Sequence, residues 1–252
     1  MNGNVIKVYK NKGETPLECI NNLKKENIEL GILPMTYAGR LDPLAEGVLL
    51  ILVGDECHRK EEYLNLSKVY EVDVLFGFAT DTYDVLGKII KCENLSAGLF
   101  KKISIIQNII PKFIGKIKQS YPSYSSRPVN GKPLFEWARE GKLSEIEIPI
   151  HDVSIKSIEI LEEREIFGKD LLEKIKDDVS KVGGDFRQKE IISIWERELR
   201  SKYEEKYPIV KFKISCGSGA YMRVLASDIG RELGLPALAL NIKRTKVGGI
   251  WN

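Results

Sequence analysis

The sequence predicts an α+β fold in which a mixed, largely antiparallel sheet carries flanking helices. Three segments, residues 69–76, 153–160 and 209–216, alternate apolar and polar side chains in the way that is typical of half-buried strands. Two others, residues 16–30 and 223–233, repeat their apolar residues at helical spacing. Together these patterns favour helices packed on one sheet, and 252 residues suffice for one large domain or two small ones.

The remaining elements follow in order along the chain. After the first helix, a loop rich in Gly, Pro and Thr runs into the apolar segment 48–53, which is typical of a buried strand. A turn-rich stretch, ATDTYDVLGK, leads from the strand at 69–76 to a short strand, KIIK, and then to a helix over residues 95–111. Gly234 and Pro236 are expected to end the last helix.

Composition excludes several classes of protein. Hydrophobic residues make up 43% of the chain and charged residues 30%, which excludes disordered and fibrous chains. The longest apolar run, residues 48–53, is far shorter than the roughly 20 residues of a membrane-spanning helix, and the N-terminus has no apolar signal core. We therefore expect a soluble, unexported, cytoplasmic protein.

The cysteines favour neither a metal site nor a disulfide framework. They lie far apart without a C-x-x-C pair, and the chain has only two histidines to help hold a metal. We therefore expect a reducing cytoplasm and no structural metal. The four positions are Cys19, Cys57, Cys92 and Cys216.

The modest net charge of +3 conceals a strongly basic segment. Residues 111–142 hold seven Lys or Arg against two Glu, interleaved with tyrosine, phenylalanine and tryptophan. A second unusual segment, residues 161–207, carries a nearly balanced run of charges with helical spacing, interrupted by VGGDF.

Asp42 is the first candidate for chemistry. In GRLDPLAEG, Pro43 disfavours helical backbone at Asp42, and the glycines at both ends permit a tight path. The carboxylate is thus presented from a constrained loop beside a buried strand, which suits a nucleophile. An Asx turn that stabilises the loop is the commoner explanation of an isolated Asp-Pro pair.

The surrounding motif favours the first interpretation. GRLDPLAEGVLLILVG resembles the catalytic segment of the bacterial TruB-type tRNA pseudouridine synthases, in which the aspartate is the nucleophile. Four further blocks resemble that family and occur in its order over most of residues 5–250. They are KVYEVDVLFGFATDTYDVLGKI, QSYPSYSSRPVNGKPLFEWAREG, SCGSGAYMRVLASDIGRELG and ALNIKRTKVGGI.

The resemblance implies a fold and a reaction. The fold is the pseudouridine synthase fold with a central RNA-binding cleft, here a single catalytic domain over residues 1–252. The reaction is isomerisation of uridine to pseudouridine at position 55 in the T loop of tRNA, without cofactor, metal, guide RNA or obligate protein partner. Two alternatives stay open: the same chemistry on another RNA, and a non-catalytic protein that binds or folds tRNA.

The resemblance also assigns roles residue by residue. Asp42 is expected to attack the target nucleotide, Arg223 to pair with that aspartate, and Tyr70 to stack on the base. Asp84 is expected to contact the flipped nucleotide, and Ile242 to line the uracil pocket. Without the motifs, Tyr70 would be an ordinary strand tyrosine, Asp84 a turn former and Ile242 a core residue.

Residues 111–142 correspond to the family's mobile thumb, which closes over the T loop. Cations and aromatic faces are the partners that phosphates and unpaired bases require. A solvated surface explains any single one of the basic residues equally well. The candidates for phosphate contact are Lys116, Lys118, Arg127, Lys132 and Arg139, with a smaller cluster of Lys243, Arg244 and Lys246 near the end of the chain.

Three features depart from the family pattern. Tyr37 replaces a histidine that helps fill the space left by flipped bases, and stacking by the tyrosine would keep this role feasible. The N-terminal motif appears as YKNKGETP. We expect no C-terminal domain of the family's PUA type, and we expect the segment 161–207 to be an insertion. We expect its GGDFRQKE portion to touch tRNA, although a solvated helical hairpin is an equal alternative.

Overall fold

The computed structural model describes residues 5–93 and 105–251, and it confirms the predicted α+β class. Its main sheet has nine strands within the described residues, and the strands of its main path run in the order β1-β3-β12-β4-β11-β10-β7. The pair β3–β12 is parallel, and the other neighbours are antiparallel. These strands are β1 (Val5–Lys10), β3 (Ala45–Val53), β12 (Ala237–Val247), β4 (Lys68–Phe76), β11 (Lys206–Cys216), β10 (Ile150–Phe167) and β7 (Gly115–Ser120).

Shorter strands complete the β-structure. β2 (Met35–Ala38) pairs with β3, and β13 (Ile250–Trp251) pairs with β12. Two small hairpins lie off the main sheet. One joins β5 (Phe78–Thr80) to β6 (Ile89–Cys92), and the other joins β8 (Pro128–Val129) to β9 (Lys132–Pro133). The predicted strand KIIK is therefore present.

The first helix illustrates how the local sequence determines an element. Thr15 accepts a hydrogen bond from the Glu18 amide, and the Glu18 side chain accepts one from the Thr15 amide, which is a capping box. The predicted helix at 16–30 is interrupted at Asn27, whose backbone is not helical. It is therefore two helices, α1 (Pro16–Glu26) and α2 (Ile28–Gly31).

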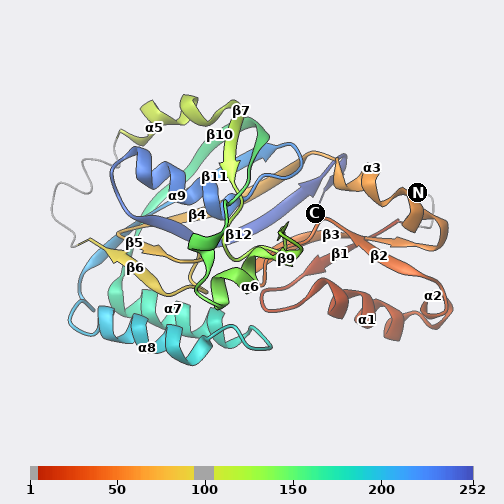
Figure 1. Cartoon of the computed structure of the whole chain (residues 1–252), viewed down its shortest axis with the longest axis horizontal. Coiled ribbons are helices and arrows are strands. Elements are labelled where there is room, and N and C mark those ends of the chain that lie inside the picture. Colours follow the sequence, from red (N-terminus) through yellow and green to blue (C-terminus); the bar gives the residue numbers. More distant parts are fainter. Residues whose placement is uncertain (1–4, 94–104, 252) are drawn as a thin grey trace.

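The other helices are arranged around the sheet (Figure 1). They are α3 (Lys60–Leu64), α5 (Ile106–Ile109), α6 (Leu134–Arg139), α7 (Gly168–Ser180), α8 (Gln188–Leu199) and α9 (Met222–Glu232), with 3-10 turns at Gly54–Arg59, Ile110–Phe113 and Leu143–Glu145. The predicted helix at 95–111 lies largely outside the described residues, and only its end is seen, in α5 and the turn after it. No helix of the described residues is long and apolar enough to cross a membrane.

Strand β4 is covered on both faces, whereas its alternation predicts a half-buried strand. Val74 and Phe76 belong to a core cluster with α9, and Leu75, on the opposite face, belongs to a cluster with α7 and α8. All five residues from Val72 to Phe76 are buried. The second cover comes from the insertion, whose packing partner the sequence does not reveal.

The segment 161–207, which is predicted to be an insertion and is called the insertion below, differs from its predicted form in its boundaries and its burial. β10 continues to Phe167 and β11 begins at Lys206, so both ends of residues 161–207 are strand rather than helix. Cross-strand pairs such as Glu165 with Lys206 explain why a charged stretch forms a strand. The helices α7 and α8 are not a solvated hairpin, because Trp195 is fully buried with its ring centroid 4.9 Å from that of Phe78.

Candidate active site

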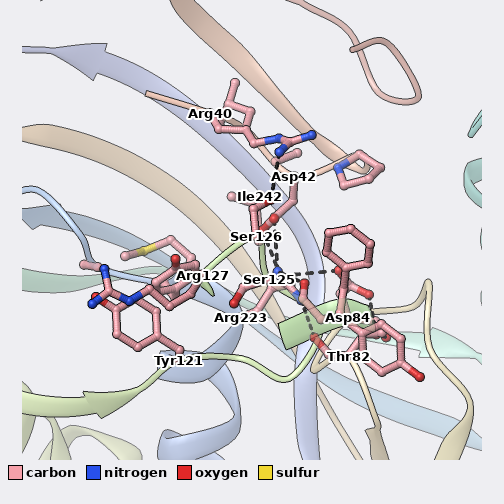
Figure 2. Close-up of a pocket in the computed structure, with 18 of the residues that line it drawn as sticks. Arg40, Asp42, Thr82, Asp84, Tyr121, Ser125, Ser126, Arg127, Arg223 and Ile242 are labelled. Atoms are coloured by element: carbon pink, nitrogen blue, oxygen red, sulfur yellow. Dashed lines mark hydrogen bonds and ion pairs between the residues drawn. The ribbon is translucent and has the colours of Figure 1, made fainter. Parts of the chain in front are cut away.

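A cavity of about 820 Å³ opens between four parts of the chain. Its walls come from the loop before β3, the turn between β5 and β6, the segment after β7, and the start of α9. Figure 2 shows Asp42, Asp84 and Arg223 converging there from three of these parts, with Ile242 of β12 beside them. Arg40 donates to the Ser126 hydroxyl at 2.8 Å, which joins two of the walls.

Asp42 and Arg223, which the sequence motifs predict to pair, form a bidentate ion pair. The Arg223 Nε donates to Asp42 Oδ2 at 2.8 Å, and Nη2 donates to Oδ1 at 3.0 Å. Arg223 is buried, whereas the Asp42 side chain keeps 34% of its surface exposed. The geometry fixes both oxygens of the carboxylate and leaves Asp42 accessible from the cavity.

The Arg223 guanidinium has further partners. Its Nη1 donates to the Thr82 carbonyl at 2.7 Å, and Nε lies 3.6 Å from Asp84 Oδ2. Burial lowers the pKa of Arg223, but the carboxylates of Asp42 and Asp84 outweigh burial and raise the pKa above its ordinary value. The arginine therefore stays charged and holds Asp42 in one orientation.

A buried lysine holds the loop that carries Asp42. Lys10 Nζ donates to the carbonyls of Ala45 at 2.6 Å and Pro43 at 3.3 Å, on either side of the turn. The Gly13 amide also donates to the Pro43 carbonyl, at 2.8 Å. Burial lowers the pKa of Lys10 to about 8. The sequence marks Lys10 only as part of an N-terminal motif, and its support of the loop becomes visible in the structure.

Asp84 is buried in the turn between β5 and β6. Its Oδ1 accepts hydrogen bonds from the Thr82 hydroxyl at 2.7 Å and from the Leu86 amide at 2.9 Å, as in an Asx turn. Burial raises the pKa of Asp84, and Arg223 opposes the rise. A Cβ on Gly87 would lie 2.2 Å from the Thr82 hydroxyl, which explains the glycine that ends the TDTYDVLG motif. Asp84 therefore forms the turn and also faces the cavity.

Tyr70 and Ile242 come from the neighbouring strands β4 and β12 and line the same cavity. Tyr70 is 9% exposed and Ile242 is 7% exposed. Burial raises the pKa of the Tyr70 phenol, and the positive charge of Arg244 opposes the rise. Both side chains give the cavity an apolar wall, which suits a base edge or face.

The cavity also has an aromatic wall, which the sequence analysis does not predict. The rings of Tyr121 and His151 are stacked with centroids 4.1 Å apart, and the Arg127 guanidinium lies 4.9 Å from the Tyr121 centroid. Tyr221 meets both rings edge-on. Tyr121 lies in the segment already singled out as basic and aromatic, and Tyr221 lies two residues before Arg223. His151 has no sequence signal that indicates the cavity.

The predicted phosphate contacts fall into two groups. Arg127 and Arg139 line the cavity. The others lie outside its lining: Lys116 and Lys118 are exposed on the edge strand β7, and Lys132 lies 4.5 Å from the Trp137 ring centroid and pairs with Glu140. For all five residues, contact with RNA stays a prediction.

Arg244, which the sequence places in a basic cluster with Lys243 and Lys246, is buried. It is 1% exposed, and it donates from Nε to the Val48 carbonyl at 2.7 Å and from Nη2 to the Gly39 carbonyl at 3.0 Å. Arg244 therefore braces the loop of Asp42, and it is also part of the cavity lining, so its contact with the substrate stays a prediction. Lys243 lies 5.9 Å from the ring centroid of Tyr9.

Tyr37 does not line the cavity. It lies on β2 opposite Ile51, packs against the cluster beneath α1, and has Lys60 Nζ 5.3 Å from its ring centroid. Its contact with RNA stays a prediction. The insertion, in contrast, does reach the cavity, because Phe186 and Arg187 are part of the lining.

Comparisons with known proteins identify relatives of the chain. A family model described as TruB family pseudouridylate synthase (N terminal domain) matches residues 29–174. A "tRNA pseudouridine synthase B" of Listeria welshimeri serovar 6b is 32% identical over 250 residues, which are 98% of this chain and 67% of that protein. A protein of the same name from Bacillus cereus is 30% identical over 97% of this chain and 66% of its own length.

Solved structures share the fold. A chain in the crystal structure of a Cbf5-Nop10-Gar1 complex superposes with a TM-score of 0.56 at 18% identity, over 99% of this chain and 50% of that chain. This chain spans about two thirds of the length of the curated relatives that it matches. From the family match and these identities, the chain belongs to the TruB family of pseudouridylate synthases.

Proposed function

We propose that the protein isomerises uridine to pseudouridine at position 55 in the T loop of tRNA. The observation that carries the proposal is Asp42, held by Arg223 through two hydrogen bonds and open to an apolar-walled cavity. The names of the relatives, tRNA pseudouridine synthase B, support tRNA as the substrate. The target position follows from the resemblance of the motifs.

The reaction breaks the bond between C1′ and N1 of uridine, rotates the uracil, and joins C5 to C1′, while C5 loses its proton and N1 gains one. Asp42 serves as the nucleophile that holds one fragment while the base turns. One carboxylate suffices because no water is added, whereas a glycoside hydrolase requires two carboxyl groups. Arg223 fixes the carboxylate in place before the substrate arrives, which avoids reorganisation during the reaction.

The uracil enters the cavity after the nucleotide leaves the stack of the T loop. Tyr70 and Ile242 then contact its faces, and Asp84 lies within reach of its polar edge or of the ribose. The raised pKa of Tyr70 favours the neutral phenol, which suits stacking on the base better than removal of a proton.

The surface around the cavity provides the electrostatic part of recognition. Arg127 and Arg139 lie at its wall, and Lys116 and Lys118 extend the basic surface along β7. Phosphate contacts of this kind position an RNA without reading its sequence. The proposed reaction is an intramolecular transfer in the cytoplasm that needs no cofactor, metal or guide RNA.

A primer-extension assay after carbodiimide treatment tests the proposal on an unmodified tRNA transcript. We expect a single new stop at position 55 after incubation with the protein. The control is the same transcript with the uridine at position 55 replaced by cytidine, and it should give no stop. Mapping of total RNA extends the assay: stops confined to another RNA would contradict the tRNA assignment, and binding without any stop would indicate a non-catalytic tRNA-binding protein.

A further inference from the structure

The loop between α7 and α8 brings the insertion to the cavity. In Figure 1 this loop lies beside α6, and the contact is direct, because Arg139 Nη2 donates to the Asp185 carbonyl at 2.6 Å. Phe186 and Arg187, the next residues of the loop, line the cavity. An inserted segment therefore forms part of the wall.

Arg187 connects three segments that lie far apart in the sequence. Its Nη1 donates to Asp81 Oδ2 at 2.7 Å, and its Nη2 donates to Oδ1 at 3.3 Å. The guanidinium carbon lies 4.4 Å from the ring centroid of Tyr124. Asp81 belongs to the turn that carries Asp84, and Tyr124 belongs to the basic, aromatic segment. A planar guanidinium can bind a carboxylate and an aromatic face at once, which a lysine cannot do in the same way.

Both partners of Arg187 are directly linked to residues that hold Arg223. Thr82, next to Asp81, accepts Arg223 Nη1 through its carbonyl at 2.7 Å. The Tyr124 carbonyl accepts Arg223 Nη2 at 3.5 Å. Asp81 Oδ1 also accepts the Lys88 amide at 2.8 Å, which closes the turn. Arg187 thus contacts side chains of the two segments whose backbone carbonyls bind Arg223.

The backbone of Arg187 gives a second, independent indication. Its φ of 64° and ψ of 26° lie in the left-handed region, which an arginine adopts only at a cost. Strained residues of this kind persist where the surroundings fix them, and they cluster at functional sites. Glycine would take the same backbone conformation without strain. The arginine at this position therefore indicates that its side chain has a role.

We propose that Arg187 is a positioning residue through which the insertion fixes the turn of Asp84 and the segment of Tyr124 in place before RNA binds. The kinetic part of this inference rests on the proposed function. Arg187 acts through Asp81 and Tyr124, and the chemistry stays with Asp42. In this chain, the insertion therefore contacts the predicted thumb segment beside the cavity.

Arg187→Gly separates positioning from stability, because it removes the side chain and also relieves the backbone strain. Hydrogen exchange without RNA should become faster by about tenfold or more in residues 80–88 and 121–129, while α7 and α8 keep their protection. Single-turnover pseudouridine formation should fall by about tenfold, with a smaller change in tRNA affinity. Arg187→Lys should keep only part of the wild-type exchange protection and part of the wild-type turnover. Lys176→Ala is the matched control, since Lys176 pairs with Glu196 within the insertion.

A double-mutant cycle of Arg187→Gly and Asp81→Asn tests whether the effect on turnover passes through the Arg187–Asp81 contact. The two single variants should each slow turnover, and the double variant should be little worse than either one, because both remove the same contact. Unchanged exchange in residues 80–88 and 121–129 would overturn the proposal, and so would faster exchange with wild-type turnover. If the wild-type protein forms no pseudouridine, the proposed function fails, and the exchange measurement alone decides whether Arg187 holds the two segments.

Discussion

At the scale of single residues, the site depends on cations that are buried for different purposes. Arg223 orients Asp42, whereas Lys10 and Arg244 bind carbonyls of the loop that carries it. The motifs predict the Asp42–Arg223 pair because both residues belong to recognisable blocks. They do not predict the inward orientation of Arg244, because a basic residue in KRTK has the same appearance whether its side chain meets a phosphate or two carbonyls.

Arg223→Lys tests the bidentate pair. A lysine keeps the charge but cannot donate to both carboxylate oxygens and to the Thr82 carbonyl in the same planar geometry. We expect single-turnover pseudouridine formation to fall by about a hundredfold or more, with tRNA affinity nearly unchanged. Arg231→Lys, on the exposed face of the same helix, should behave as wild type. Near-normal turnover by Arg223→Lys would show that the second hydrogen bond is dispensable.

Lys10 predicts a dependence of stability on pH. Burial lowers its pKa from 10.5 to about 8, so between these values the unfolded chain binds more protons at this residue than the folded chain does. The contribution of Lys10 to the free energy of unfolding should therefore rise with pH from about 8 and level off near its ordinary pKa.

The measurement for Lys10 is the difference in unfolding free energy between wild type and Lys10→Met, taken by urea titration at several pH values. The difference should grow in favour of wild type as the pH rises from 8 to 10. Lys25→Met on the exposed face of α1 is the control, because its difference from wild type should stay flat. A flat difference for Lys10→Met as well would contradict a lowered pKa.

At the scale of elements, the sequence predicts what depends on local pattern and misses what depends on contacts. The strand β4 and the helices α1 and α9 follow from periodicity and caps. The ends of the insertion do not, because the charges of β10 that suggest a solvated helix pair across the sheet with lysines of β11. The sequence also does not predict that α7 and α8 share a core cluster with Leu75 of β4, because these residues are distant in the sequence.

Gly13→Ala tests the contact between the N-terminal loop and the insertion. Gly13 has a φ of 79°, and a Cβ would lie 2.1 Å from the Lys181 carbonyl oxygen. We expect a loss of about 2–4 kcal/mol in unfolding free energy, from backbone strain and overlap together. Gly131→Ala is the matched control, since Gly131 has nearly the same φ, 78°, but no atom lies within 4 Å of the position of its Cβ. Equal losses of unfolding free energy in the two variants would contradict a clash between the added Cβ and Lys181.

At the scale of the whole molecule, a net charge of +3 conceals a concentration of arginines in the cavity lining, among them Arg40, Arg127 and Arg139. The edge strand β7 carries Lys116 and Lys118 on an exposed surface, while the insertion balances its own charges in pairs such as Lys176 with Glu196. The sequence shows the basic segment by composition alone. Which of its residues face the cavity depends on the folded path of the chain, and this separates Arg127 and Arg139 from the others.

The salt dependence of tRNA binding tests this distribution. Each cation that contacts a phosphate steepens the slope of log affinity against log salt by roughly 0.7–0.9. A Lys116→Gln, Lys118→Gln double variant should therefore flatten the slope by about 1.5. Lys176→Gln should leave it unchanged. A double variant with the wild-type slope would show that β7 lies outside the RNA contact.

The central claim is that Asp42 is the nucleophile of a tRNA pseudouridine synthase, and Asp42→Asn tests it most directly. Asparagine keeps the size of the side chain and one acceptor for Arg223, so tRNA affinity should stay within about threefold of wild type. Single-turnover pseudouridine formation at position 55 should fall by at least about a thousandfold, because the amide is no nucleophile. Turnover by Asp42→Asn within tenfold of wild type would contradict the account.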